Sequence, residues 1–268
     1  MSIYDVNGNI IPTGGGGDSG WRKFPWLNIA HKGTAPEQYG NSIYSINRSH
    51  ELGMDGIEID VRMTADDVIV LSHDAEVVGT DSQGNTQTLT IINSNYSDLA
   101  SLTLFSIDGV DYHIITLNEV LRMAFNWKMF VQLDHKSQAN TVECSIKCSE
   151  LVRDNGMIGN VLYSGWHAAP DLITANDPLA KFYVGASTDI PSSEYADIPL
   201  ERLWISINRQ NLPADMSTIN RNRPLCIWDV GAAQATAIME KRPNMIQWTG
   251  DTDGASLSET YLANLQWT

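Results

Sequence analysis

The chain has 268 residues, of which 43% are hydrophobic and 18% are charged. No stretch approaches the roughly 18 consecutive apolar residues that a membrane span needs, and the apolar content argues against a wholly disordered chain. Lys and Arg number 17 against 32 Asp and Glu, so the net charge of −15 disfavours nucleic acid and anionic membrane as partners. An acidic protein that handles an anionic substrate must supply positive charge locally, so we look for a cation site.

Residues 1–25 are predicted to be a leader or linker, because they include the glycine run 14–17, which is typical of flexible chain. The leader lacks the basic and apolar regions of a signal peptide, which predicts a cytoplasmic location for the chain as given. An extracellular location, or attachment to a larger assembly through the leader, stays open. Three cysteines are too few for a disulfide framework, and we expect Cys144 and Cys148 to be small buried residues of a helix.

From residue 26 onward, short apolar runs alternate with helix-like segments. The predicted strands are 26–31, 55–63, 67–74, 129–136, 160–166, 181–187, 202–208, 224–230 and 244–250. The predicted helices are about 38–52, 116–127, 140–155, 168–176, 215–222 and 231–242. Strands separated by helices at this spacing indicate parallel units, and eight or so of them favour an α/β TIM (β/α)8 barrel in one domain, 26–268. An open doubly wound sheet is the alternative, although no glycine-rich dinucleotide turn follows any strand.

The stretch 75–115 is polar and rich in turn residues, so it breaks the alternation of strands and helices. We predict that this excursion passes over one mouth of the barrel.

Two carboxylates share one face of the strand at 55–63. Side chains alternate along a strand, so Glu58 and Asp60 point one way and the apolar residues between them point toward the helices. Two carboxylates held inside a barrel repel each other unless positive charge lies between them. A hard divalent cation with oxygen ligands would supply that charge, whereas the alternative interpretation is a pair of solvated charges at a strand end.

Further polar residues occur near the ends of other predicted strands. Asp134 and Lys136 share a face, so Asp134 could be a third oxygen ligand and Lys136 could meet an anionic oxygen, while His135 points the other way. His31 and His73 each end a predicted strand, at the side where barrel enzymes carry their active sites. Two histidines beside three carboxylates favour acid/base chemistry over purely structural roles.

The segment AHKGTAPEQYGNSIYSINRSHELGMDGIEIDVRMTADDVIVLSHDAEV resembles the opening of the glycerophosphodiester phosphodiesterase family. That family shows His-Arg-Gly, Pro-Glu-Asn, Gly-x-Asp-x-Ile-Glu-x-Asp-Val, Thr-x-Asp-Gly and His-Asp in this order and at similar spacing. LDHK at 133–136 resembles its Leu-Glu-Ile-Lys, CIWDV its Trp-Thr-Val segment, and IQWTGD its closing strand. The resemblance runs from about residue 27 to 251 and implies a TIM barrel with the family's insertion after the second strand.

The resemblance also implies roles for individual residues. Glu58, Asp60 and Asp134 would hold one divalent cation, Ca²⁺ or Mg²⁺. His31 and His73 would be the catalytic acid and base, Lys32 and Lys136 would meet phosphate oxygens, and Trp228 would line the pocket near the alcohol group.

Four positions depart from the family's pattern. Lys32 replaces an Arg, so a point charge replaces a bidentate fork, and Asp134 replaces a Glu, which shortens a ligand by one methylene. Gln38 replaces the Asn that the family usually has, and Asp67 replaces its usual Gly.

The implied reaction is the metal-dependent hydrolysis of a small-molecule phosphodiester to glycerol 3-phosphate and an alcohol. A phospholipase-D or sphingomyelinase-D-like lyase acting on lysophospholipids is one alternative, because related enzymes use a similar site. A non-catalytic barrel that binds phosphate or glycan, inactivated by Lys32 and Asp134, is the other.

Overall fold

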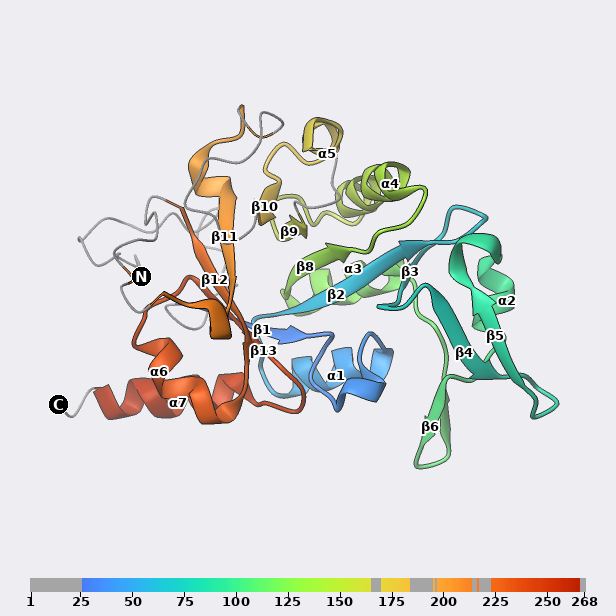
Figure 1. Ribbon diagram of the computed structural model, residues 1–268, viewed down its shortest axis with the longest axis horizontal. Helices are drawn as coiled ribbons and strands as arrows, with labels where there is room; N and C mark the ends of the chain where they lie inside the picture. Colours follow the sequence, from blue (N-terminus) through green and yellow to red (C-terminus); the bar gives the residue numbers. More distant parts are fainter. Residues whose placement is uncertain are drawn as a thin grey trace.

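The computed structural model describes residues 26–164, 170–183, 195, 197–213, 216 and 223–265. Eight parallel strands close into a ring (Figure 1). They are β1 (Leu27–His31), β2 (Gly56–Met63), β8 (Phe130–His135), β9 (Val161–Ser164), β10 (Lys181–Tyr183), β11 (Leu203–Asn208), β12 (Leu225–Val230) and β13 (Met245–Trp248). Because β1 pairs in parallel with both β13 and β2, the ring of eight strands has no free edge, and the predicted barrel is confirmed. The division into a leader and one domain stays a prediction, since residues 1–25 lie outside the described part.

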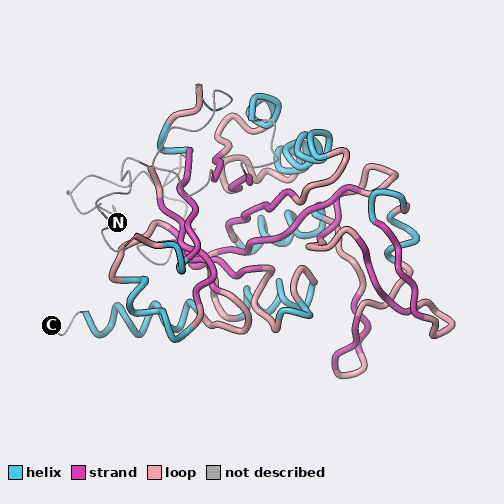
Figure 2. Tube along the Cα trace, in the orientation of Figure 1, coloured by secondary structure: helices cyan, strands magenta, loops and turns pink. Residues whose placement is uncertain are grey.

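Helices surround the ring of strands (Figure 2). They are α1 (Ile43–Glu51), α3 (Leu117–Trp127), α4 (Thr141–Asp154), α5 (Pro170–Asn176), α6 (Ala235–Met239) and α7 (Gly254–Leu265), with short 3-10 turns at Glu37–Tyr39, Leu200–Arg202, Arg209–Asn211 and Ala232–Gln234. The outward residues Ile57, Ile59 and Val61 of β2 are fully buried in the layer between strands and helices. Cys144 and Cys148 of α4 lie in the same layer, free and buried as predicted. Within the described residues, no helix has the length and apolar character to cross a bilayer.

An apolar cluster fills the interior of the barrel toward the amino ends of the strands. Seven strands each contribute one buried side chain: Ile29, Phe130, Leu162, Tyr183, Trp204, Cys226 and Met245. The eighth strand, β2, contributes Gly56, where an added Cβ would lie only 2.3 Å from the carbonyl oxygen of Phe130 and 2.7 Å from Cδ1 of Ile29. A side chain at position 56 would therefore disrupt this cluster, on which the polar residues nearer the carboxyl ends of the strands rest.

The chain between β2 and α3 leaves the ring. The predicted strand at 67–74 is β3 (Ile69–Leu71), which pairs antiparallel with the end of β2 and so is not a barrel strand. The excursion then forms two hairpins, β4 (Glu76–Thr80) with β5 (Thr86–Thr90) and β6 (Phe105–Ile107) with β7 (Val110–Tyr112), joined through a 3-10 turn at Ile91–Asn93 and helix α2 (Tyr96–Ala100). Figure 1 shows these hairpins on the side toward which the arrowheads of β1 and β2 point. That this excursion is equivalent to the family's insertion stays a prediction.

Some helices differ from the prediction. The helix predicted at 231–242 is shorter, with a 3-10 turn before α6. The helix predicted from residue 38 begins at Ile43, because Asn41 adopts a left-handed conformation (φ 55°) and Ser42 forms a capping box with Ser45. The final helix α7 was not predicted, although Asp253 accepts a hydrogen bond from the backbone of Ser256 at its start. The predicted helix at 215–222 lies outside the described residues except for residue 216.

Candidate active site at the carboxyl ends of the strands

Three carboxylates meet inside the mouth of the barrel. Glu58, Asp60 and Asp134 each offer an oxygen, and these oxygens all lie within 4.8 Å of one another. The convergence follows from the sheet, because Asp60 of β2 and Asp134 of β8 are direct partners in the parallel register. Glu58 and Asp60 are 2% and 1% exposed, so bulk water does little to screen their repulsion.

The electrostatics of this carboxylate cluster call for positive charge. Burial, followed by the nearby Asp60 and Asp134, raises the pKa of Glu58 well above its ordinary value. Burial would also raise the pKa of Asp134, but the ammonium of Lys136 and a hydrogen bond from Tyr183 hold it below its ordinary value. A cluster of closely spaced oxygen donors with excess negative charge fits a hard divalent cation.

Lys136 provides part of that positive charge. Its Nζ donates a hydrogen bond to Oδ2 of Asp134 at 2.7 Å and lies 2.8 Å from Oδ1 of Asp60. Burial opposes the charged form, but the two carboxylates outweigh it and raise the pKa of Lys136. The shared face predicted for Asp134 and Lys136 thus brings Lys136 against two carboxylates, while the neighbouring His135 is buried on the other side and stacks near Tyr163.

His31 and Lys32 lie beside the third carboxylate. Nε2 of His31 is 3.8 Å from Oε2 of Glu58, and the backbone N–H of Lys32 donates to the same oxygen at 3.0 Å. Burial, followed by the charge of Lys32, lowers the pKa of His31. The ammonium of Lys32 pairs with Glu37 instead of pointing into the carboxylate cluster.

His73 lies on the rim, more exposed than His31. Its Nδ1 is 2.8 Å from Oδ1 of Asp74. Arg62, two residues after Asp60 on β2, donates to the backbone carbonyl of His73 through Nη2 at 2.8 Å and Nε at 3.3 Å. We did not predict a role for Arg62, although strand alternation places it on the same face as Asp60.

Asn41 is a second residue that the sequence analysis missed. Its Nδ2 donates to Oδ2 of Asp60 at 2.7 Å, and its Oδ1 accepts from the backbone N–H of Asp60 at 3.0 Å. Gln38, which we placed at the family's Asn position, is instead exposed in a 3-10 turn. The amide that meets Asp60 is that of Asn41, three residues after Gln38.

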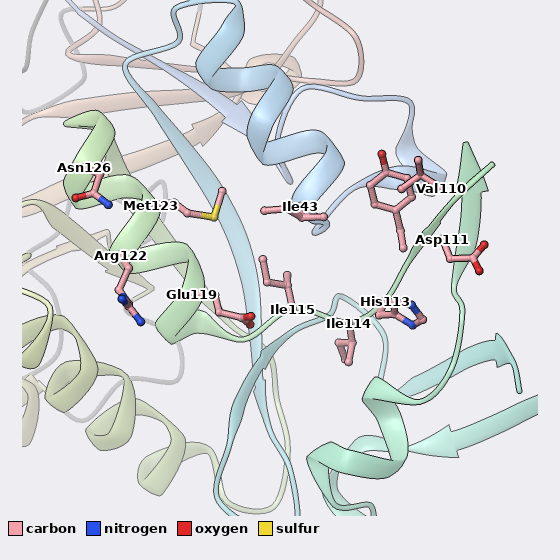
Figure 3. A pocket seen from close by; sticks show the side chains of 11 residues that line it. Ile43, Val110, Asp111, His113, Ile114, Ile115, Glu119, Arg122, Met123 and Asn126 are labelled. Carbon is pink, nitrogen blue, oxygen red and sulfur yellow. The ribbon is translucent and has the colours of Figure 1, made fainter. Parts of the chain in front are cut away.

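Two cavities lie near the excursion. One, of about 530 Å³, is lined by Lys32, Asn41 and His73 on the barrel side and by Val77 and Phe105 on the excursion side. The other, of about 580 Å³, lies outside the barrel between Ile43 of α1, Met123 of α3 and the β6–β7 hairpin (Figure 3). The outer cavity is slightly larger, but only the first contains residues of the predicted site.

Trp228, the predicted site residue on β12, lies apart from the two strands β2 and β8 that carry the carboxylates. It lies toward the carboxyl end of β12, opposite Asn208 of β11, and its side chain is 37% exposed. The structure therefore places it at the accessible end of its strand, in contact with solvent.

Comparisons of the sequence with known proteins show the family of the chain. The sequence model of the glycerophosphoryl diester phosphodiesterase family matches residues 31–215. A glycerophosphodiester phosphodiesterase from Caldanaerobacter subterraneus is 45% identical over 51 residues, which are 19% of this chain and only 21% of that relative.

Solved structures resemble the whole barrel. A glycerophosphoryl diester phosphodiesterase from Parabacteroides distasonis superposes with a TM-score of 0.67 at 20% identity, over 99% of this chain and 94% of that one. A phosphodiesterase from Oleispira antarctica, solved in complex with the product sn-glycerol-3-phosphate, gives a TM-score of 0.67 at 17% identity, over 90% of this chain and 97% of that one. At such identities these likenesses establish the fold.

Proposed function

Since the chain belongs to the glycerophosphoryl diester phosphodiesterase family, we propose that it hydrolyses glycerophosphodiesters to sn-glycerol 3-phosphate and an alcohol. The observation that carries this proposal is the cluster of Glu58, Asp60 and Asp134, with His31 beside it, inside one mouth of the barrel. The glycerol phosphate product bound by the Oleispira antarctica structure supports the same reaction. The comparisons do not favour the lyase or the non-catalytic alternative.

In this proposal the three carboxylates hold one divalent cation, either Ca²⁺ or Mg²⁺. Their oxygen chemistry, their close spacing and their excess negative charge support that role. The cation would stabilise the negative charge that develops on the phosphoryl oxygens. Lys136 and Lys32 would bind those oxygens as point charges, and Trp228 would contact the alcohol portion of the substrate.

His31 and His73 would transfer the protons. The lowered pKa of His31 leaves its imidazole neutral near pH 7, which suits a base that accepts a proton from the attacking hydroxyl. His73 would give a proton to the oxygen of the leaving alcohol. Asp74 contacts its Nδ1 and leaves Nε2 to donate, and Arg62 fixes the backbone from which this ring projects.

Substitution of each histidine tests the assignment. We expect His31→Ala and His73→Ala each to lower the rate of glycerophosphocholine hydrolysis by about 10²–10⁴-fold, the usual contribution of one acid or base. His50→Ala is the matched control, because His50 is an exposed residue of α1 that stacks on Trp127, away from the carboxylate cluster. Hydrolysis by both test variants at the rate of the His50→Ala control would show that these histidines are not the acid and base.

Removal of the cation tests the role proposed for the three carboxylates. A chelator should abolish hydrolysis, and added Ca²⁺ or Mg²⁺ should restore it. Full activity after exhaustive chelation would contradict the role proposed for the three carboxylates.

A further inference from the structure

The ammonium of Lys136 occupies a position within the carboxylate cluster itself. It lies 2.7 Å from Oδ2 of Asp134 and 2.8 Å from Oδ1 of Asp60, both at ion-pair distance. The other oxygen of Asp60 is engaged by the amide of Asn41. Oδ1 of Asp60 is therefore the oxygen of that carboxylate that remains for a cation, and it is the one that Lys136 faces.

Glu58 differs from the two aspartates. Among the described residues, Lys136 forms ion pairs with the two aspartates and none with Glu58, although its charge favours the ionised form of Glu58 from farther away. Oε2 of Glu58 accepts a hydrogen bond from the backbone of Lys32. The direct contacts of Lys136 thus lie on one side of the cluster, where Asp60 of β2 and Asp134 of β8 are paired. A divalent cation that binds all three carboxylates must draw on the same oxygens as the ammonium.

We propose that Lys136 competes with the divalent cation for Asp60 and Asp134, and so lowers the affinity of the site for the ion. This inference rests on the cation site of the proposed function. A lysine suits this role because its ammonium is a compact charge on a flexible stem and cannot itself coordinate a metal.

The position of Lys136 allows such an exchange. Its backbone N–H is fixed to the carbonyl of Val61, while its side chain remains 20% exposed at the mouth. The stem can therefore swing from the carboxylates toward a phosphate oxygen without moving β8. Ion binding would then release the ammonium for the substrate, so that the ion and the phosphate favour each other's binding.

Calorimetric titration of Ca²⁺ and of Mg²⁺, without substrate, tests the proposal. Lys136→Met removes the charge and keeps a long side chain, and it should tighten cation binding by at least about tenfold, because a positive charge at contact distance from two ligands is lost. Lys136→Arg retains the charge and should bind the ion with an affinity near that of the wild type. Lys147→Met is the matched control, since its ammonium pairs with Glu150 on α4, away from the carboxylate cluster, and it should change the affinity by less than about threefold.

Equal or weaker cation binding by Lys136→Met would overturn the proposal while leaving the cation site intact. Absence of cation binding by wild type and variants alike would remove both the cation site and this inference.

A second measurement avoids the risk that Lys136→Met does not fold. In the wild type with labelled lysines, the Cε resonance of Lys136 should shift as the cation saturates the site, because the ammonium leaves two carboxylates. A resonance that stays unchanged through saturation would refute the exchange.

Discussion

The hydrogen-bonded pair formed by Asn41 and Asp60 makes a quantitative prediction about stability. Replacing Asn41 with glycine removes both hydrogen bonds while keeping a residue that adopts φ 55° without strain. The backbone N–H of Asp60 loses an acceptor, and its carboxylate, only 1% exposed, loses an amide donor. One neutral hydrogen bond and one to a charged group together contribute about 2–4 kcal/mol.

A loss of about 3 kcal/mol in the free energy of unfolding, the middle of this range, should lower the Tm of a protein this size by about 6–12 °C. Thermal unfolding followed by circular dichroism at pH 7, in excess chelator, measures this directly. Lys128→Gly is the matched control, because Lys128 is exposed, ends α3 and has a left-handed conformation of φ 58°. That control should leave Tm unchanged or slightly raised, since glycine suits this conformation. A Tm for Asn41→Gly equal to that of the control would refute the claim that Asn41 holds Asp60 in place.

Three further predictions concern charge and positioning. Because the pKa of Glu58 is raised, the unfolded chain loses that proton at lower pH than the folded protein, so stability is lost as pH rises above the ordinary value of 4.5. In chelator, Glu58→Gln should therefore unfold at a higher temperature than the wild type at pH 7, and this advantage should shrink at pH 4; a variant less stable at pH 7 would contradict the assignment. Arg62→Met should lower kcat about tenfold with a smaller change in KM, because the backbone carbonyl of His73 loses both hydrogen bonds from the guanidinium. Arg62→Lys should restore little of the lost kcat, since an ammonium does not reproduce the paired donors. An unchanged kcat would exclude this positioning role. Burial lowers the pKa of Lys181 to about 8, so the folded protein loses this proton at lower pH than the unfolded chain. Between pH 8 and 10 the free energy of unfolding of the wild type, measured by urea denaturation, should therefore rise by on the order of 2 kcal/mol relative to Lys181→Met. Parallel pH profiles for the two proteins would contradict the lowered pKa of Lys181.

The carboxylates were predictable because strand periodicity is strict. Once 55–63 is a strand with an apolar face toward helices, Glu58 and Asp60 must share the inner face. The convergence of Asp134 with them depends on the parallel register of β2 and β8, which local sequence does not encode. The resemblance to a family supplied this expectation, since it implies that the three carboxylates share one cation.

The errors arose where chain direction changes. The run at 67–74 has a good strand pattern, but it turns back on β2 because its first residue, Asp67, adopts a left-handed conformation. The left-handed Asn41 similarly delays α1 and brings an amide onto Asp60. Such turns combine one unusual backbone angle with a contact to a distant strand, so a sequence pattern alone does not locate them.

The pairing of β1 with β13 joins residues from opposite ends of the described chain, Leu27 with Met245 and Ala30 with Trp248. β13, the last strand of the described residues, thus seals the cylinder next to His31. We expect a nascent chain that stops short of Met245 to expose an unpaired edge along β1 and to leave the strand that carries His31 unsupported on that side, however completely the earlier strands have formed. Closure of the barrel therefore requires contacts between residues more than 200 positions apart, and such long-range pairing slows folding.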